Sequence, residues 1–134
     1  LADLEIEGEA ATLMITRLSG AHERMEVDEH ERAFARLATP IAKYWLTKQS
    51  NPVVREALEC VGGNGYVEDS IMPRLYREAP LNAIWEGAGN VIALDIGRAV
   101  SRNPESVDAF LNELDHSRGR DSGIDTRLDQ VRSD

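Results

Sequence analysis

The sequence is poor in cysteine, in aromatic residues and in long apolar runs. Its single cysteine, Cys60, excludes an internal disulfide framework and fits a reducing compartment, so we expect a cytoplasmic protein. No apolar run approaches the roughly 20 residues that a membrane-spanning helix needs, and no signal peptide is visible, so we expect no membrane partner. Aromatic residues make up only 5% of the chain, and alanine and leucine dominate its apolar residues. That composition is typical of helix-on-helix packing.

Positive charge is also scarce. Fifteen Lys and Arg residues stand against 24 Asp and Glu residues, for a net charge of −9. This balance argues against unaided binding to nucleic acid or to an anionic membrane. The length of 134 residues and the hydrophobic content of 42% suit one domain with one core. Because the chain starts at Leu1 inside a helical pattern, without an initiator methionine, we expect it to be part of a longer protein.

Apolar residues recur at helical spacing in the first half of the chain. Over residues 1–25 they are separated by three, four and seven positions, which predicts an amphipathic helix. A second helix is predicted to begin after Asp28, which is placed to form a capping pair with Glu31. We expect it to continue across Pro40 with a kink, because proline removes one backbone hydrogen bond.

The second half of the chain is divided by cap and proline signals. Asn51-Pro52 is a cap followed by a proline, which predicts that a new short helix begins there and ends at Gly62. No segment shows the period-two alternation of a strand. We therefore predict an all-α fold, an antiparallel helical bundle with one long glycine-rich connection. It forms a single domain, with a core bundle of residues 1–101 and a helical tail of residues 102–134. Further helices are predicted over three ranges: 91–100, 104–114 and 124–131.

The connection, residues 61–90, holds five of the ten glycines and two prolines. Its Gly-Gly-Asn-Gly run, residues 62–65, has two interpretations. Ordinary turn chemistry explains it and is favoured by the pattern alone. The alternative is that glycines let backbone amides approach a ligand, as in loops that bind phosphate. Arg74 and Arg77 lie three residues apart on one helical face, where exposed salt bridges are the favoured interpretation and an anion contact is the alternative.

Glu86 is the candidate catalytic residue of the connection. It lies between Trp85 and Gly87 at the expected start of a helix, where an acid is also favoured simply by the helix dipole. Its apolar and sterically open neighbourhood indicates a second role, because a carboxylate beside an aromatic side chain suits proton abstraction from carbon. The three histidines show no spacing typical of metal ligands, so no metal site is expected.

Together these residues resemble the C-terminal helical domain of the acyl-CoA dehydrogenase family. The similar motifs are a GGNGY turn at residues 62–66, the Arg77-Glu78 dipeptide and the Glu86-Gly87 pair. The segment that begins at Met72, MPRLYREAPLNAIWEGAGN, is most similar to the alkylation-response branch of that family. The resemblance covers residues 1–101.

The resemblance implies a flavoenzyme with two further domains that binds FAD between the subunits of a homotetramer. It implies that Glu86 is the base that removes the α-proton of an acyl-CoA thioester while FAD takes the β-hydrogen as hydride. The backbone N–H of Glu86 is implied to hold the thioester oxygen, and Gly87 to leave room for the acyl chain. The implied contacts to the FAD of a neighbouring subunit are Glu59, Gly62, Gly63, Ala88, Gly89 and Asn90.

Three positions depart from the family pattern. Ala88 stands where most members have threonine or serine, which removes a hydroxyl contact to the cofactor. Glu59 stands where glutamine is common, which places a negative charge near an anionic cofactor. Arg77 is followed by Glu78 rather than by the usual aspartate, which is a milder change.

Three functions remain open from the sequence. The first is the C-terminal domain of an FAD-dependent acyl-CoA dehydrogenase, for which the isolated chain is expected to be inactive and not to retain FAD. The second is a DNA-associated flavoprotein of the alkylation or stress response. Residues 98–134 hold six arginines against eight acids, a net charge of −2 that disfavours it, although Arg118 and Arg120 offer a local contact. The third is a module that serves packing and tetramerisation only.

Overall fold

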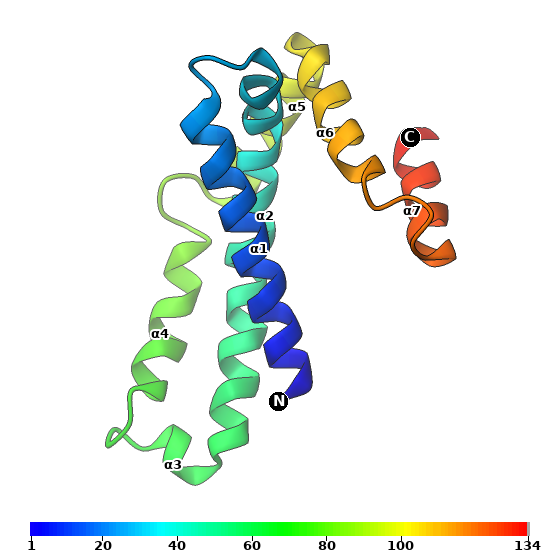
Figure 1. The fold of residues 1–134 in the computed structure, drawn as a ribbon. Helices are drawn as coiled ribbons and strands as arrows, with labels where there is room; N and C mark the ends of the chain where they lie inside the picture. The colour runs from blue at the N-terminus through cyan, green and yellow to red at the C-terminus, as the bar shows by residue number, and fades with distance from the viewer. Residues whose placement is uncertain (134) are drawn as a thin grey trace.

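The computed structural model describes residues 1–133, which form seven helices and no strand (Figure 1). The predicted all-α fold is therefore confirmed. None of these helices is long and apolar enough to cross a bilayer. Within the same residues, no group of three His, Cys, Asp or Glu side chains is placed to hold a metal ion. The helices are α1 (Ala2–Arg24), α2 (Glu29–Val61), α3 (Gly63–Tyr66), α4 (Met72–Asn82), α5 (Gly89–Arg102), α6 (Pro104–Asp115) and α7 (Ser122–Ser133).

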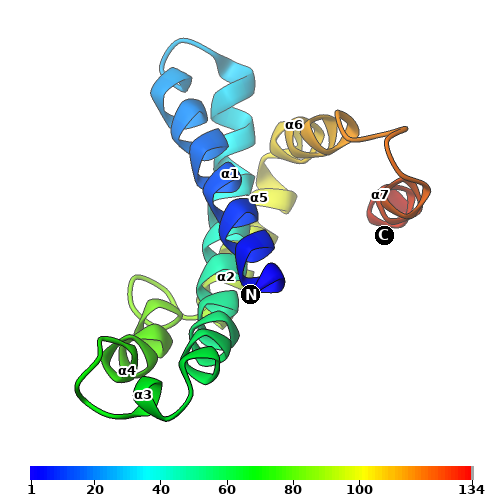
Figure 2. The ribbon, with the colours of Figure 1, turned by 60° about the horizontal axis from the view of Figure 1, so that its bottom comes forward.

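The long helix α2 is the centre of the fold. It packs against α1, α3, α4, α5 and α6, whereas α7 contacts only α6 among the described helices. α1 and α4 both run antiparallel to α2, with α4 beside its C-terminal half (Figure 1). The hairpin of α6 and α7 projects to one side of the bundle (Figure 2). A single helix thus sets the positions of nearly all the others.

The core is built mainly from alanines. Small side chains let helix backbones approach closely, and buried alanines of α1, α2 and α6 meet around Phe34. The rings of Phe34 and Phe110 stack with their centroids 6.3 Å apart and their planes 15° apart. Because Ala109 of α6 belongs to this cluster, α6 packs as part of the bundle; the division at residue 101 stays a prediction. The buried members of the cluster are Ala21, Phe34, Ala35, Ala38 and Ala109.

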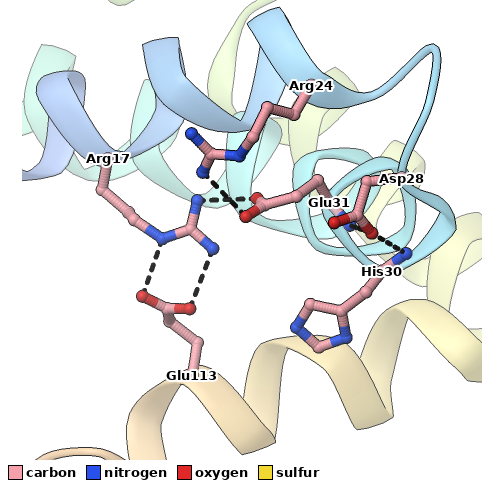
Figure 3. A network of polar contacts seen from close by, with 6 residues as sticks. All are labelled: Arg17, Arg24, Asp28, His30, Glu31 and Glu113. Carbon is pink, nitrogen blue, oxygen red and sulfur yellow. Dashed lines mark hydrogen bonds and ion pairs between the residues drawn. The ribbon is translucent and has the colours of Figure 1, made fainter.

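The start of α2 is capped as predicted by Asp28, whose Oδ1 accepts hydrogen bonds from the backbone N–H groups of His30 (2.9 Å) and Glu31 (3.2 Å). The reciprocal half of the capping pair is absent, because the Glu31 carboxylate accepts hydrogen bonds from Arg17 and Arg24 of α1, each at 2.8 Å (Figure 3). The cap of α2 is therefore coupled to a polar contact between helices.

This polar contact extends to α6. Arg17 also donates two hydrogen bonds to Glu113, at 2.8 and 2.9 Å (Figure 3). Its guanidinium lies 4.2 Å from the centre of the Phe34 ring. Burial raises the pKa of Glu31, but hydrogen bonds from Arg24 and Arg17 outweigh it, so the net pKa is lowered. The hydrogen bonds from Arg17 also lower the pKa of Glu113. Arg17 therefore joins three helices around two ionised carboxylates.

The prediction that α2 continues across Pro40 is confirmed, but the predicted helix boundary at Asn51-Pro52 is wrong. α2 is one helix of 33 residues with both prolines inside it. An internal proline costs about 3 kcal/mol because it removes a hydrogen bond and crowds the preceding turn. Packing of α4 along this part of α2 offsets that cost, since most helical stability in proteins comes from tertiary contacts.

The long glycine-rich connection contains two helices that the sequence reasoning missed, α3 and α4. Pro73 lies in the first turn of α4, where its missing N–H is harmless. The side chains of Pro73 and Ala79 are buried against the bundle. The proline and the helical spacing of Leu75 and Ala79 were the available signals for α4.

Candidate active site

Glu86 lies in the irregular segment between α4 and α5, with an unusual backbone. Its φ is +54°, and it is the one non-glycine residue in residues 1–133 with a positive φ. Gly87 follows with a φ of +120°. For a residue with a side chain, the left-handed region costs roughly 1–2 kcal/mol. Backbone strain of this kind clusters at active sites and ligand-binding segments, and the side chain of Glu86 is exposed, so its packing does not account for the strain.

Glu86 does not lie in the first turn of a helix. α5 begins at Gly89 with Ala88 as its N-terminal cap, so the expectation that a helix starts at Glu86 is corrected by three residues. The helix dipole acts mainly within the first turn. The alternative explanation of Glu86 as a simple N-terminal acid therefore loses its support.

A groove of about 580 Å³ opens beside Glu86. Its walls come from the end of α1, the first half of α2, the Glu86-Gly87 segment and α5. One wall is apolar at Val91 and Ile92, and another carries several cationic side chains. The arrangement suits a ligand that has both an apolar and an anionic part. The lining residues used below are Arg32, Arg36, Thr39, Lys43, Glu86 and Asp95.

The cationic wall follows one face of α2. Arg32, Arg36, Thr39 and Lys43 are spaced by four, three and four residues, which places them on the same side of a helix. Arg36 donates two hydrogen bonds of 3.0 Å to Asp95 of α5 and thereby ties the two walls together. These hydrogen bonds lower the pKa of the Asp95 carboxyl. Sequence reasoning missed this wall, although its helical spacing was readable.

The end of the groove near Glu86 is fixed by Lys43. Its ammonium donates a hydrogen bond of 2.9 Å to the backbone carbonyl of Trp85, the residue before Glu86. The indole of Trp85 is itself more than half exposed. The contact therefore anchors the backbone of the segment rather than its aromatic side chain.

The predicted cofactor residues Ala88, Gly89 and Asn90 line a second cavity of about 580 Å³, together with Tyr44 and Lys48 of α2. A Cβ atom on Gly89 would lie 3.2 Å from the Tyr44 ring and 3.3 Å from the Lys48 side chain. Close packing therefore favours glycine there. Because Ala88 has no capping side chain, no hydroxyl or carboxylate of the cap residue covers the first amides of α5.

The other predicted cofactor residues, Glu59, Gly62 and Gly63, lie at the far end of α2. At about 1.5 Å per residue, Glu59 is about 24 Å along the helix from Lys43. The structure therefore brings Glu86 and Gly87 close to the residues 88–90 but not to the residues 59–63. Glu59 pairs with Arg55, with Nε and Oε1 3.0 Å apart. Its negative charge is thus compensated inside the chain.

The three glycines of the GGNG run have three different explanations. Gly62 has φ +69° and ψ −148°, a region that is open essentially to glycine alone. A Cβ atom on Gly65 would lie 2.4 Å from the carbonyl oxygen of Leu58, so α3 approaches α2 too closely for a side chain. At Gly63 an added Cβ would meet nothing within 4 Å, and its φ is not positive. Nothing within residues 1–133 therefore requires glycine at position 63.

Arg77, of the Arg-Glu dipeptide, donates hydrogen bonds of 2.8 and 3.3 Å to the Glu68 carboxylate. Of the two exposed salt bridges favoured from the sequence, the one at Arg77 is therefore present, whereas Arg74 forms none within residues 1–133.

Comparison with known proteins decides the family. The family model described as "Acyl-CoA dehydrogenase, C-terminal domain" matches residues 1–101. The chain belongs to this family. It is 42% identical over 122 residues to the putative acyl-CoA dehydrogenase AidB of Escherichia coli, an alignment that covers 91% of this chain and 22% of that protein. It is 35% identical over 131 residues to acyl-CoA dehydrogenase family member 11 of Caenorhabditis elegans, covering 96% and 21%.

A solved structure shares the fold. The crystal structure of Caenorhabditis elegans ACDH-11 in complex with C11-CoA superimposes with a TM-score of 0.77 at 32% identity, covering 98% of this chain and 23% of that one. The resemblance to the family and to its alkylation-response branch is confirmed. This chain spans about a fifth of the length of the curated relatives given above.

Proposed function

We propose that the protein carrying this chain is an FAD-dependent oxidoreductase that dehydrogenates an acyl-CoA thioester, with Glu86 as its base. The observation that carries the proposal is the strained backbone of Glu86 at the edge of a groove, at the position of the family's Glu-Gly pair. The family match supports the reaction class. The similar solved structure, in complex with C11-CoA, supports a CoA thioester as the ligand.

In this proposal the Glu86 segment supplies the proton chemistry. The carboxylate of Glu86 accepts the α-proton of the thioester. Its backbone N–H makes no hydrogen bond within residues 1–133 and is therefore available to hold the thioester oxygen as negative charge develops. Gly87 presents no side chain beside the apolar wall formed by Val91 and Ile92, which leaves room for the acyl chain.

The residues present fit FAD as the cofactor. Neither the backbone conformation nor the packing of residues 1–133 requires glycine at position 63, as expected if a ligand approaches its backbone. The pairing of Glu59 with Arg55 reduces the conflict between the Glu59 charge and an anionic cofactor. Two separated groups of contacts suit a long dinucleotide: Glu59, Gly62 and Gly63 in one, and Ala88, Gly89 and Asn90 in the other. When bound, FAD supplies the acceptor for the hydrogen and electron pair of the β-carbon.

We further propose that the full-length protein is a cytoplasmic homotetramer and that the chain alone is inactive. The exposed Cys60 fits a reducing compartment. Ile6 and Leu13, seven residues apart on one face of α1, are both mostly exposed, which supports burial of that face against other domains or subunits. Light scattering of the full-length protein tests the tetramer, and a monomer would refute it.

No observation in residues 1–133 specifically favours the alternative function, a DNA-associated flavoprotein. Arg118, one of its two candidate contacts, is paired with Asp115 (3.3 Å) and Asp129 (2.9 Å). DNA binding would require an affinity that falls steeply with salt. A measurable, salt-dependent affinity of the full-length protein for duplex DNA would revive this function.

The flavin absorbance of the full-length protein tests the proposed function. We expect a bound flavin spectrum that bleaches when saturated acyl-CoAs are added, and no bleaching in the Glu86→Gln variant. Glu23→Gln, at an exposed position outside the groove, is the matched control and should bleach like the unmodified protein. A protein that stays colourless after addition of FAD refutes the enzyme proposal. Bleaching by Glu86→Gln refutes the role of Glu86.

A further inference from the structure

Lys43 connects the central helix to the candidate catalytic segment. Its Nζ donates a hydrogen bond of 2.9 Å to the carbonyl oxygen of Trp85. The side chain is partly buried and lines the same groove as Glu86. Since α2 is packed on several sides, Lys43 offers a rigid point of attachment to a segment that has no regular structure of its own.

The hydrogen bond acts on a particular peptide group. The carbonyl of Trp85 and the N–H of Glu86 belong to the same planar trans peptide, so they point in opposite directions. Fixing the carbonyl oxygen therefore also fixes the direction of the N–H. A cation at the carbonyl oxygen also polarises the peptide and makes its N–H a stronger donor. The Glu86 N–H has no hydrogen-bond partner within residues 1–133 and is free to bind a ligand.

The backbone of the segment requires such an anchor. Glu86 and Gly87 both have positive φ, and a non-glycine residue there persists only when its surroundings impose it. Before them, the N–H groups of Ile84 and Trp85 bond to the carbonyl of Leu81, at 2.9 and 3.1 Å. After them, α5 begins with the bond from Ile92 to Ala88, at 3.0 Å. Lys43 holds the peptide between these two ends.

We propose that Lys43 is a positioning residue whose ammonium orients and polarises the Trp85–Glu86 peptide, so that the Glu86 N–H binds the carbonyl oxygen of the thioester. This inference rests on the proposed function, because it assumes a CoA thioester in the groove. It assigns to Lys43 no contact with the reacting atoms. The proposed effect acts through the carbonyl oxygen of the ligand, whereas a contact of the Lys43 charge with an anionic part of the ligand would weaken the thioester and its thioether analogue equally.

The test compares two ligands in the full-length, FAD-loaded protein. All variants carry Glu86→Gln, which prevents turnover and keeps the backbone N–H. The ligands are a saturated acyl-CoA thioester and its thioether analogue, in which a methylene group replaces the carbonyl. Dissociation constants are measured by calorimetry. We expect Lys43→Met to weaken thioester binding up to about tenfold, the effect of one lost hydrogen bond to the ligand, and to change thioether binding less than about twofold.

Two further variants complete the test. Lys43→Arg keeps a cationic donor and should recover most of the preference for the thioester, and Lys43→Gln replaces Lys43→Met if the latter does not fold. Arg120→Met removes one exposed positive charge outside the groove and should bind both ligands normally. Equal weakening of both ligands by the Lys43 variants, or no weakening of either, overturns the inference. Bleaching of the flavin by acyl-CoA in the protein with Glu86 intact tests the proposed function independently of Lys43.

Discussion

Gly63 and Gly65 lie two residues apart in the same short helix but are predicted to respond oppositely to an added methyl group. At Gly65 the new Cβ would lie 2.4 Å from the carbonyl oxygen of Leu58 and 3.1 Å from the Cβ of Val61. The nearest atom is backbone of α2 and cannot rotate away, so α3 must shift. At Gly63 the same methyl group meets nothing within 4 Å.

The magnitudes follow from these contacts. Overpacking of a buried site costs typically about 1–3 kcal/mol, and we expect Gly65→Ala to lower the free energy of unfolding by that amount. Gly63→Ala has no clash and reduces the conformational freedom of the unfolded chain, which stabilises by about 0.4–1 kcal/mol. The two variants should therefore differ by about 1.4–4 kcal/mol.

Urea unfolding of the 134-residue chain, followed by circular dichroism, measures this difference. FAD binding to the full-length protein, followed by flavin fluorescence, gives the second readout. If a ligand approaches the backbone at position 63, Gly63→Ala weakens FAD binding although it does not destabilise the chain. Normal FAD binding by Gly63→Ala would refute the inference that this glycine serves the cofactor. A stability loss equal to that of Gly65→Ala would refute the packing argument itself.

Three further predictions concern ionisable side chains. The pKa of Glu31 is lowered in the folded chain, so its stabilisation is present above the ordinary pKa near 4.5 and is lost as the pH falls through the lowered value. Urea midpoints should therefore show Glu31→Gln about 1–3 kcal/mol less stable at pH 7 but no less stable than the unmodified chain at the lowest pH; a constant difference would contradict this. Glu86→Gly should relieve about 1–2 kcal/mol of backbone strain, although glycine also makes the unfolded chain freer and so offsets part of this gain. Thermal unfolding should therefore show Glu86→Gly to be no less stable than Glu86→Gln. A clearly lower stability of Glu86→Gly would contradict the strain. Arg55→Met should leave the charge of Glu59 unpaired and weaken FAD binding in fluorescence titrations by about fivefold. Adding Glu59→Gln to this variant should restore FAD binding. If it does not, the weaker binding is not caused by the charge of Glu59.

The helical parts of the fold were readable from sequence because periodicity and caps are local signals. The spacing over residues 1–25 and the cap at Asp28 each depend on neighbours within a turn or two. The continuity of α2 was not readable, because Asn51-Pro52 is a valid local start signal that packing of α4 overrides. Tertiary contacts alone decide such a conflict.

Of the residues of the candidate site, too, some could be predicted from the sequence and others could not. Glu86 was singled out because an acid beside glycine and tryptophan stands out in a helical sequence. The role of Gly87 came from the family resemblance, and both roles stay predictions. Lys43 was missed because a lysine on an amphipathic helix is ordinary, and only the fold shows that its ammonium meets the carbonyl of Trp85. The positive φ of Glu86 was likewise not readable, since nothing in the residue type requires it. Roles that depend on the backbone of a distant segment leave little trace in a single sequence.

The unbroken course of α2 explains how two separated groups of predicted contacts can serve one protein. Tyr44 and Lys48 of this helix line the cavity of Ala88, Gly89 and Asn90, and Glu59 lies near its C-terminal end. A helix that ended at Asn51 would let these groups move relative to each other through a flexible joint. One continuous helix fixes their separation at about 1.5 Å per residue. Because α4 packing keeps Pro52 within this helix, the distance between that cavity and the glycine turn is set by α2.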